Sequence, residues 1–201
     1  MPAGCYGVLM EAPHSPEVSR AAPAEPSAWV QRWAPLVPAG GPVLDVACGG
    51  GRHALFFAAR GHPVDAVDRD AAAVAALAAQ SGQSSISALC ADLEGGPWPY
   101  ADRQFAAIVV TNYLHRPLFP ALMAALAPGG VLIYETFAQG NEACGRPANP
   151  DFLLQRGELL RAVGTARVVA YEDLYVEQPR PAMVQRICAV VTAGVIGENP
   201  F

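Results

Sequence analysis

The chain has 201 residues, of which 52% are hydrophobic and only 15% are charged. This composition indicates a globular protein, and the length fits one domain with an ample core. The formal net charge of −5 argues against a protein that grips nucleic acid by its phosphates. All 13 basic residues are arginine, which excludes Schiff-base chemistry, pyridoxal phosphate attachment and a P-loop lysine.

The cysteines and the hydropathy pattern bear on metals and on location. None of the five cysteines forms a Cys-x-x-Cys pair, so neither a zinc site nor a redox dithiol is indicated. Their odd number and the lack of a signal-peptide pattern predict a reducing, cytoplasmic location. No apolar stretch reaches the roughly 18 residues that a membrane-spanning helix needs. We therefore expect no metal and neither a membrane nor a nucleic acid as partner, and the oligomeric state is left open.

The first segment of the chain differs in composition from the rest. Residues 1–26 contain several prolines and no apolar periodicity, which predicts a flexible N-terminal arm. Ser27 then suits the N-cap of a short helix over residues 28–34. Trp29, Val30 and Trp33 fall on one side of this helix. They are expected either to pack against a sheet or to include one tryptophan that covers a ligand site.

The most informative stretch is residues 42–53, Pro-Val-Leu-Asp-Val-Ala-Cys-Gly-Gly-Gly-Arg-His. Its apolar start predicts a buried strand, and the three glycines predict a turn that a ligand can approach closely. Residues 53–60 then read as a helix, and a second strand over 63–67 leads to Asp68. An acid about 20 residues past a glycine turn, after the second strand, holds the ribose hydroxyls in nucleotide-binding βαβ units.

The pattern of strand and helix continues to residue 136. Asp70 suits the N-cap of a helix over 71–80, and a third strand over 86–90 precedes Asp92 and Leu93. A β-branched run predicts a fourth strand over 105–111, which delivers residues 112–116 to its carboxyl end. A helix is expected from Pro117 to Leu126, with Pro128-Gly129-Gly130 ending it before a fifth strand over 131–136.

The last third of the chain is expected to hold a long loop, a helix and two strands. Residues 137–151 form a polar loop, and residues 152–163 read as a helix despite Gly157. Strands over 167–176 and 183–192 are joined by so short a link that they must be antiparallel. Residues 27–192 are thus expected to form a single domain, and residues 193–201 a C-terminal tail.

These motifs resemble the class I S-adenosylmethionine-dependent methyltransferases. The first motif of that family is present as Asp45-x-Ala47-x-Gly49-x-Gly51, with alanine in place of the first glycine. The acid after the third strand and the Pro-Gly-Gly turn before the fifth are similar too. Cys-Gly-Gly-Gly-Arg and Asn149-Pro-Asp-Phe-Leu-Leu are closest to the small-molecule branch that includes the tellurite-resistance and thiopurine-type enzymes. The resemblance implies an α/β, Rossmann-like, doubly wound sheet of order 3-2-1-4-5-7-6, mostly parallel with one antiparallel strand near the edge.

The resemblance also implies roles for individual residues. Asp68 is expected to accept from the ribose hydroxyls of S-adenosylmethionine and Asp92 from the adenine amino group, while Arg52 pairs with the methionine carboxylate. The residues expected to bind the cofactor are Asp45, Ala47, Cys48, Gly49, Gly51, Arg52, Asp68, Arg69, Asp92, Leu93 and Asn112. Methyl transfer is an in-line displacement that positioning can accelerate. Tyr113 and His115 are the candidate catalytic residues, with His115 as a base if one is used.

Two other functions stay open on the sequence. A nicotinamide-dependent oxidoreductase would share Gly49 and Gly51, although the third fingerprint position holds Ala54. A protein that binds the cofactor without turnover is the second alternative. For loop 137–151, we expect a wall of the substrate pocket, with Arg146 facing an anionic or polarisable small-molecule acceptor. The alternative for this segment is an ordered surface loop.

Overall fold

The structure is a computed structural model that describes residues 25–82 and 85–192. The predicted C-terminal tail, and all of the predicted N-terminal arm except residues 25 and 26, lie outside the described residues. Within the described ranges, no helix combines the length and the apolar character needed to cross a membrane.

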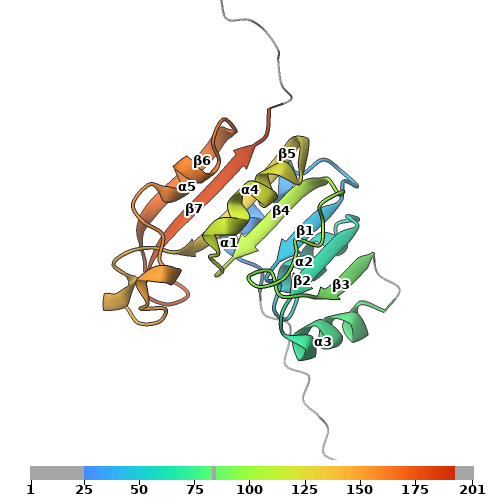
Figure 1. Ribbon diagram of the computed structural model, residues 1–201, viewed down its shortest axis with the longest axis horizontal. Helices are drawn as coiled ribbons and strands as arrows, with labels where there is room; N and C mark the ends of the chain where they lie inside the picture. Colours follow the sequence, from blue (N-terminus) through green and yellow to red (C-terminus); the bar gives the residue numbers. More distant parts are fainter. Residues whose placement is uncertain (1–24, 83–84, 193–201) are drawn as a thin grey trace, which may run out of the picture.

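Seven strands form one twisted sheet in the order β3-β2-β1-β4-β5-β7-β6 (Figure 1). The strands are β1 (Val43–Val46), β2 (Val64–Asp68), β3 (Ile86–Cys90), β4 (Phe105–Thr111), β5 (Leu126–Phe137), β6 (Arg167–Val176) and β7 (Ala182–Val190). The first five pair in parallel, and β7 runs antiparallel to both β5 and β6. This arrangement confirms the predicted fold class, strand order and single antiparallel strand.

Helices cover both faces of the sheet. They are α1 (Ala28–Trp33), α2 (Arg52–Ala58), α3 (Ala71–Ser81), α4 (Phe119–Ala124) and α5 (Glu158–Ala162). One apolar cluster joins the sheet to α4 and α5, and a second joins the opposite face to α1, α2 and α3. Neighbouring residues of one strand enter different clusters, as Ile108 and Val109 do. This is why β1 and β4 read as continuous apolar runs rather than as alternating ones.

Local contacts explain why the first helices start where they were predicted to start. The Ser27 side chain accepts from the Trp29 amide, and Asp70 accepts from the first amides of α3. Trp29 and Val30 are buried against the sheet, and the Trp29 indole donates to the Ile187 carbonyl at 3.3 Å. Packing against the sheet, one of the two alternatives for this helix, therefore accounts for Trp29.

Three predicted boundaries were wrong. The helix expected over 152–163 is only α5, because Gly157 adopts φ +66° and Leu154 pairs with Ala138 in an extended bridge. The helix expected from Pro117 begins as a 3₁₀ turn, Arg116–Leu118, and continues as α4. Strand β5 starts at Leu126 rather than 131, since the Pro-Gly-Gly segment itself pairs with Val191 through hydrogen bonds of 2.8 and 2.9 Å.

Candidate active site

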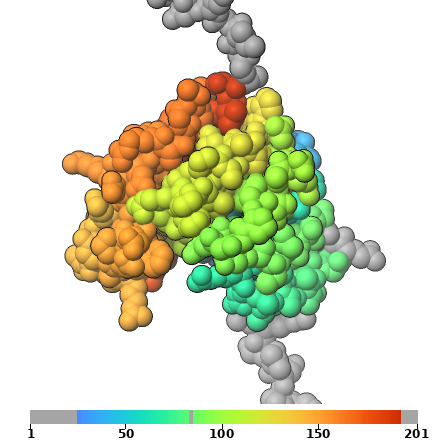
Figure 2. Space-filling view, viewed as in Figure 1, coloured from blue at the N-terminus to red at the C-terminus, as the bar shows by residue number. Residues whose placement is uncertain are grey.

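The carboxyl ends of the parallel strands open onto a hollow of about 420 Å³, called here the principal hollow (Figure 2). Figure 2 shows the surface sunken between its orange and green parts. Ligands of open α/β sheets bind at this edge. The principal hollow is lined by Ala47, Asp68, Arg69, Ala91, Asp92, Leu93, Glu94, Asn112, Tyr113, Leu114, Thr136, Phe137, Pro147 and Phe152. It brings together seven of the residues predicted from sequence, from Ala47 at the end of β1 to Tyr113 after β4.

Asp68 links the end of β2 to the glycine turn. Its Oδ2 accepts from the Gly49 amide at 2.7 Å, and its Oδ1 accepts from the Asp70 amide at 2.9 Å. An ionised carboxylate has about four acceptor sites, so two backbone bonds leave capacity for a ligand. Asp68 can therefore shape the turn and accept from hydroxyl groups in the hollow.

Asp92 follows β3 and is exposed to the principal hollow. Its Oδ1 accepts from the Glu94 amide at 3.0 Å. Hydrogen bonds from the Glu94 and Gly95 amides hold the pKa of Asp92 below its usual range. Asp92 is thus a charged acceptor at neutral pH, which suits the amino group of a base.

The glycine turn has two functions that fall on different residues. Gly49 has φ +51°, and a Cβ added to it would meet nothing within 4 Å, so a ligand can approach this backbone. Gly51 has φ +75°, and its Cβ would overlap the Leu77 side chain of α3. Gly51 therefore serves helix packing. Cys48 is buried, and its amide donates to the Val67 carbonyl at 3.0 Å. Ala47, at φ +52°, lines the hollow in the left-handed conformation that glycine adopts with less strain.

Asp45 does not line the principal hollow but supports the turn from below. It is buried, and its Oδ2 accepts from the Ala54 amide at 2.9 Å. His53 Nδ1 lies 4.0 Å from Asp45 Oδ1, and His53 Nε2 accepts from the Ser27 amide at 3.2 Å. Burial raises the pKa of Asp45 to about 7 and lowers the pKa of His53 to about 3. Both groups are therefore largely uncharged in weakly acidic solution, and together they join β1, α2 and the start of α1.

This pair gives an expected pH dependence. Between its ordinary pKa of 3.8 and about 7, Asp45 keeps its proton in the folded protein and loses it in the unfolded chain. Its contribution to stability therefore falls as the pH rises through this window. Asp45→Asn keeps an acceptor for the Ala54 amide but cannot ionise. The free energy of unfolding of this variant, relative to that of the wild type at the same pH, is expected to rise from pH 4 to 7. The rise amounts to up to about 4 kcal/mol.

His53→Gln provides the opposite control, measured by urea unfolding at each pH. The unfolded chain protonates His53 below its ordinary pKa of 6.5, whereas the folded protein keeps it neutral down to about 3. The free energy of unfolding of His53→Gln, relative to that of the wild type at the same pH, is expected to fall as the pH rises from 4 to 6.5. Parallel curves for Asp45→Asn and the wild type would show that Asp45 is charged in the folded protein.

Arg52 lies in an adjoining second hollow of about 590 Å³, rather than beside Asp68 and Asp92. Its Nη1 contacts the Glu25 carbonyl at 3.5 Å. The second hollow shares Asn112 and Phe137 with the principal one. It also holds Glu135, which pairs with Arg186 at 2.6 Å and accepts from the Ser27 hydroxyl at 2.8 Å. An elongated ligand reaching Arg52 from the principal hollow would pass Asn112.

The two candidate catalytic residues are placed differently. Tyr113 lines the principal hollow, and burial with the nearby Glu94 and Asp92 raises its pKa to about 12. At neutral pH its hydroxyl is a hydrogen-bond donor and not a base. His115 contributes to none of the hollows described here, and its carbonyl accepts from the Leu118 amide at 3.0 Å. Tyr113 therefore lines the hollow, whereas His115 does not line it but lies near enough to Asp92 to help lower the pKa of that carboxyl.

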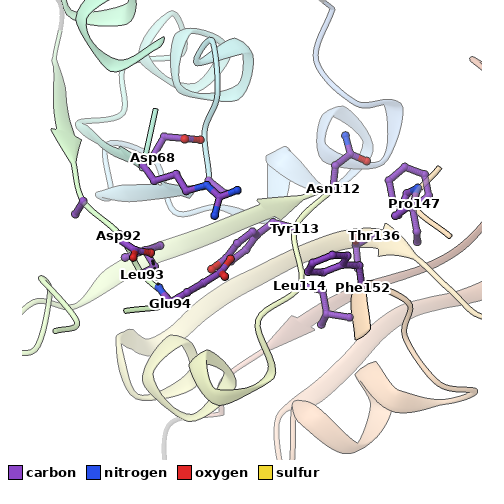
Figure 3. Close-up of a pocket in the computed structure, with 14 residues that line it drawn as sticks. Asp68, Asp92, Leu93, Glu94, Asn112, Tyr113, Leu114, Thr136, Pro147 and Phe152 are labelled. Carbon is purple, nitrogen blue, oxygen red and sulfur yellow. Dashed lines mark hydrogen bonds between the residues drawn. The ribbon is translucent and has the colours of Figure 1, made fainter. Parts of the chain in front are cut away.

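Several residues of the principal hollow were not predicted individually. Figure 3 shows carboxylates at one end and Leu114, Thr136, Pro147 and Phe152 at the other, with Tyr113 between them. Glu94 could have been found from its place beside Asp92 and Leu93. Pro147, from the segment predicted to be a loop, lines the hollow together with Phe137, which is the last residue of β5. Arg146 does not line it, and occupies a separate hollow described below.

A strand order of 3-2-1-4-5-7-6, with one acid at the end of β2 and another just after β3, is that of the class I methyltransferase fold. A family model described as "Methyltransferase domain" matches residues 43–130. The matched residues include the glycine turn, both acids and Tyr113. A search of curated proteins found no match.

Solved structures with this fold include proteins that are named as methyltransferases. TehB from Haemophilus influenzae is 17% identical with a TM-score of 0.70; the match covers 82% of this chain and 61% of TehB. An S-adenosylmethionine-dependent methyltransferase from Mesorhizobium loti is 17% identical with a TM-score of 0.64 and coverages of 81% and 98%. The glycopeptide N-methyltransferase MtfA, complexed with S-adenosylhomocysteine, is 18% identical with a TM-score of 0.60 and coverages of 84% and 90%.

Proposed function

We propose that the protein is an S-adenosylmethionine-dependent methyltransferase that acts on a small-molecule acceptor. The observation that carries this proposal is the meeting of Ala47, Asp68 and Asp92 at one hollow, with the open backbone of Gly49 held to Asp68 by a hydrogen bond of 2.7 Å. Each group has the chemistry that one part of the cofactor requires. The match to a methyltransferase domain and the complex of MtfA with S-adenosylhomocysteine support the same reading.

The residues present fit the cofactor from end to end. Asp92 and Leu93 would hold the adenine, and Asp68 would accept from the ribose hydroxyls. The methionine part would pass the open backbone at Gly49 toward Arg52 in the second hollow, where the guanidinium matches a carboxylate. The size of both hollows lies within the range of small-molecule sites.

When bound, the cofactor supplies a methyl group already activated on a sulfonium. The protein then needs to orient the acceptor, exclude water and leave the line of attack open. Phe137 and Phe152 supply apolar surface to the principal hollow, and the Tyr113 hydroxyl is an uncharged hydrogen-bond donor in the same hollow. Because His115 lies outside the hollow, we propose an acceptor that needs no histidine base, such as a thiol that ionises by itself.

The first experiment is calorimetric titration with S-adenosylmethionine, S-adenosylhomocysteine and NADH. Micromolar binding of the first two and none of NADH is the expected result. Binding of NADH alone would favour the oxidoreductase alternative. A panel of thiols, selenite, tellurite, phenols and small amines, monitored for S-adenosylhomocysteine, then tests turnover. Cofactor binding without any turnover across acceptors that bind would favour the non-catalytic alternative.

A further inference from the structure

A third hollow, of about 540 Å³, adjoins the principal hollow. It is lined by Arg146, Pro147, Ala148, Asn149, Phe152 and Arg180. Pro147 and Phe152 also line the principal hollow, and Arg180 also lines the second one. The third hollow therefore adjoins the principal hollow at Pro147 and Phe152 and the second hollow at Arg180, so a molecule bound in it could extend past Phe152 into the principal hollow.

The charge of the third hollow is one-sided. Both of its charged residues are arginines, and no carboxylate is among its lining residues. Within the described part of the chain, neither Arg146 nor Arg180 forms an ion pair or a side-chain hydrogen bond, whereas Arg116 and Arg186 are paired with glutamates. In a chain with a net charge of −5, two unpaired guanidinium groups in one hollow form a local positive site.

The same hollow offers apolar surface next to the charges. Phe152 is 50% exposed, so its ring is available to a ligand. The Arg180 guanidinium carbon lies 5.3 Å from the centre of the Phe137 ring, so this arginine stands at the apolar wall shared by the principal and second hollows. An apolar body on these rings would place an attached anion within reach of the guanidinium groups.

The acidic residues nearest to these arginines along the chain, Glu142, Asp151 and Glu177, do not line the third hollow. Glu142, on the same loop as Arg146, accepts from the Gly140 amide at 2.8 Å through its Oε2. Glu177 precedes Arg180 by three positions but does not line the third hollow. Arg52 lies in the second hollow, where the proposed methionine carboxylate would use it. Arg146 and Arg180 are therefore left for another anion.

We propose that the methyl acceptor is an apolar acid. Its carboxylate, sulfate or phosphate group binds at Arg146 and Arg180, and its apolar body lies on Phe152 and Phe137. The methyl-accepting atom, at the far end, enters the principal hollow. A bond forms between that atom and the methyl carbon, the carbon–sulfur bond of the sulfonium breaks, and its electron pair stays on sulfur as a neutral thioether. Any acceptor proton leaves to water, and the anionic group is unchanged.

This inference rests on the proposed function for the transfer step, but its binding test does not. The probes are 4-phenylbutanoate and its amide, which differ in charge and share their apolar part. Titrated calorimetrically into the full chain, with and without S-adenosylhomocysteine, the acid is expected to bind at least about ten-fold more tightly than the amide. Phenethyl phosphate and phenethyl sulfate, titrated alongside, identify which anionic group is preferred.

Substitutions then locate the charge that is responsible. Arg146→Gln and Arg180→Gln are each expected to weaken binding of the acid about 5-fold, and the double variant to bring it to the level of the amide. Arg180→Lys is expected to retain part of the affinity, since a point charge remains. Arg156→Gln is the matched control, because Arg156 is exposed and lines none of the three hollows. It is expected to bind the acid as the wild type does.

Equal binding of acid and amide, or binding of neither, would overturn the inference. If Arg156→Gln weakened binding of the acid as much as Arg146→Gln or Arg180→Gln does, the inference would also be overturned. The acid would then be attracted by the positive charge of any surface arginine and not by a site at Arg146 and Arg180. All variants are expected to keep their affinity for S-adenosylhomocysteine within two-fold; a collapse in Arg180→Gln would place this arginine in the cofactor site instead. If even the wild type fails to bind S-adenosylhomocysteine, the proposed function fails, while the comparison of acid and amide still decides whether the anion site exists.

Discussion

Gly51→Ala is expected to lower the free energy of unfolding by about 2 to 5 kcal/mol. Gly51 has φ +75°, a conformation in which a residue with a Cβ is strained by about 1 to 2 kcal/mol. An added Cβ would lie within 3.0 Å of Leu77 Cγ and closer still to its two methyl carbons. Leu77 is fully buried in the core, so relief of this overlap requires repacking, which adds about 1 to 3 kcal/mol.

The two neighbouring glycines provide matched controls in the same turn. Gly49→Ala adds a Cβ in open space at φ +51°, so only the backbone strain of about 1 to 2 kcal/mol is expected. Gly50 lacks a positive φ, and its Cβ would also meet nothing, so Gly50→Ala is expected to be nearly neutral. Urea unfolding of the three variants checks the order. A loss in Gly51→Ala no larger than in Gly49→Ala would mean that α3 moves freely away from the turn.

The strands and the two acids could be predicted because local sequence determines them. The run from Phe105 to Thr111 is apolar and rich in β-branched residues, and it forms β4 over those residues. Asp68 and Asp92 were found because parallel strands place their carboxyl ends at one edge of the sheet. The same reasoning brought Leu93, Asn112 and Tyr113 to the hollow, where the structure has them.

The errors come from contacts between residues distant in sequence. Leu154 follows an apolar run that reads as a helix, but it pairs with Ala138 at the end of β5, which lies outside any local window. The side chain of Gln185 also donates to the Gln155 carbonyl at 2.7 Å and holds this segment extended. The helix can begin only after Gly157 has turned the chain.

The direction in which a loop side chain points was also beyond the sequence. Loop 137–151 was predicted to wall the substrate pocket with Arg146; Pro147 lines the principal hollow, but Arg146 lines the third hollow with Arg180. Arg180 comes from the link between β6 and β7, for which the sequence showed no functional pattern. Likewise, the contact between Asp45 and His53 depends on how α2 packs on β1. Asp45 was expected to bind the cofactor, but it is buried and supports the glycine turn through its hydrogen bond to the Ala54 amide.

Asp68→Ala is expected to weaken S-adenosylmethionine binding by about 1.5 to 3 kcal/mol, or roughly 10- to 150-fold. In the proposed site, this carboxylate accepts from both ribose hydroxyls. It also accepts from the Gly49 amide at 2.7 Å, so its removal frees the turn that the cofactor approaches. Asp68→Asn keeps one carbonyl acceptor and is expected to fall between alanine and the wild type.

The neighbouring Asp70 separates these effects from a general loss of structure. Asp70 accepts from the Ala72 and Ala73 amides at 2.9 and 3.1 Å and caps α3, but it does not line the principal hollow. Asp70→Ala is therefore expected to lower stability by about 1 kcal/mol and to leave cofactor affinity nearly unchanged. Calorimetric titration and urea unfolding of both alanine variants test this separation. Unchanged affinity in a folded Asp68→Ala variant would remove Asp68 from the ribose site, since no other carboxylate from the end of β2 reaches that position.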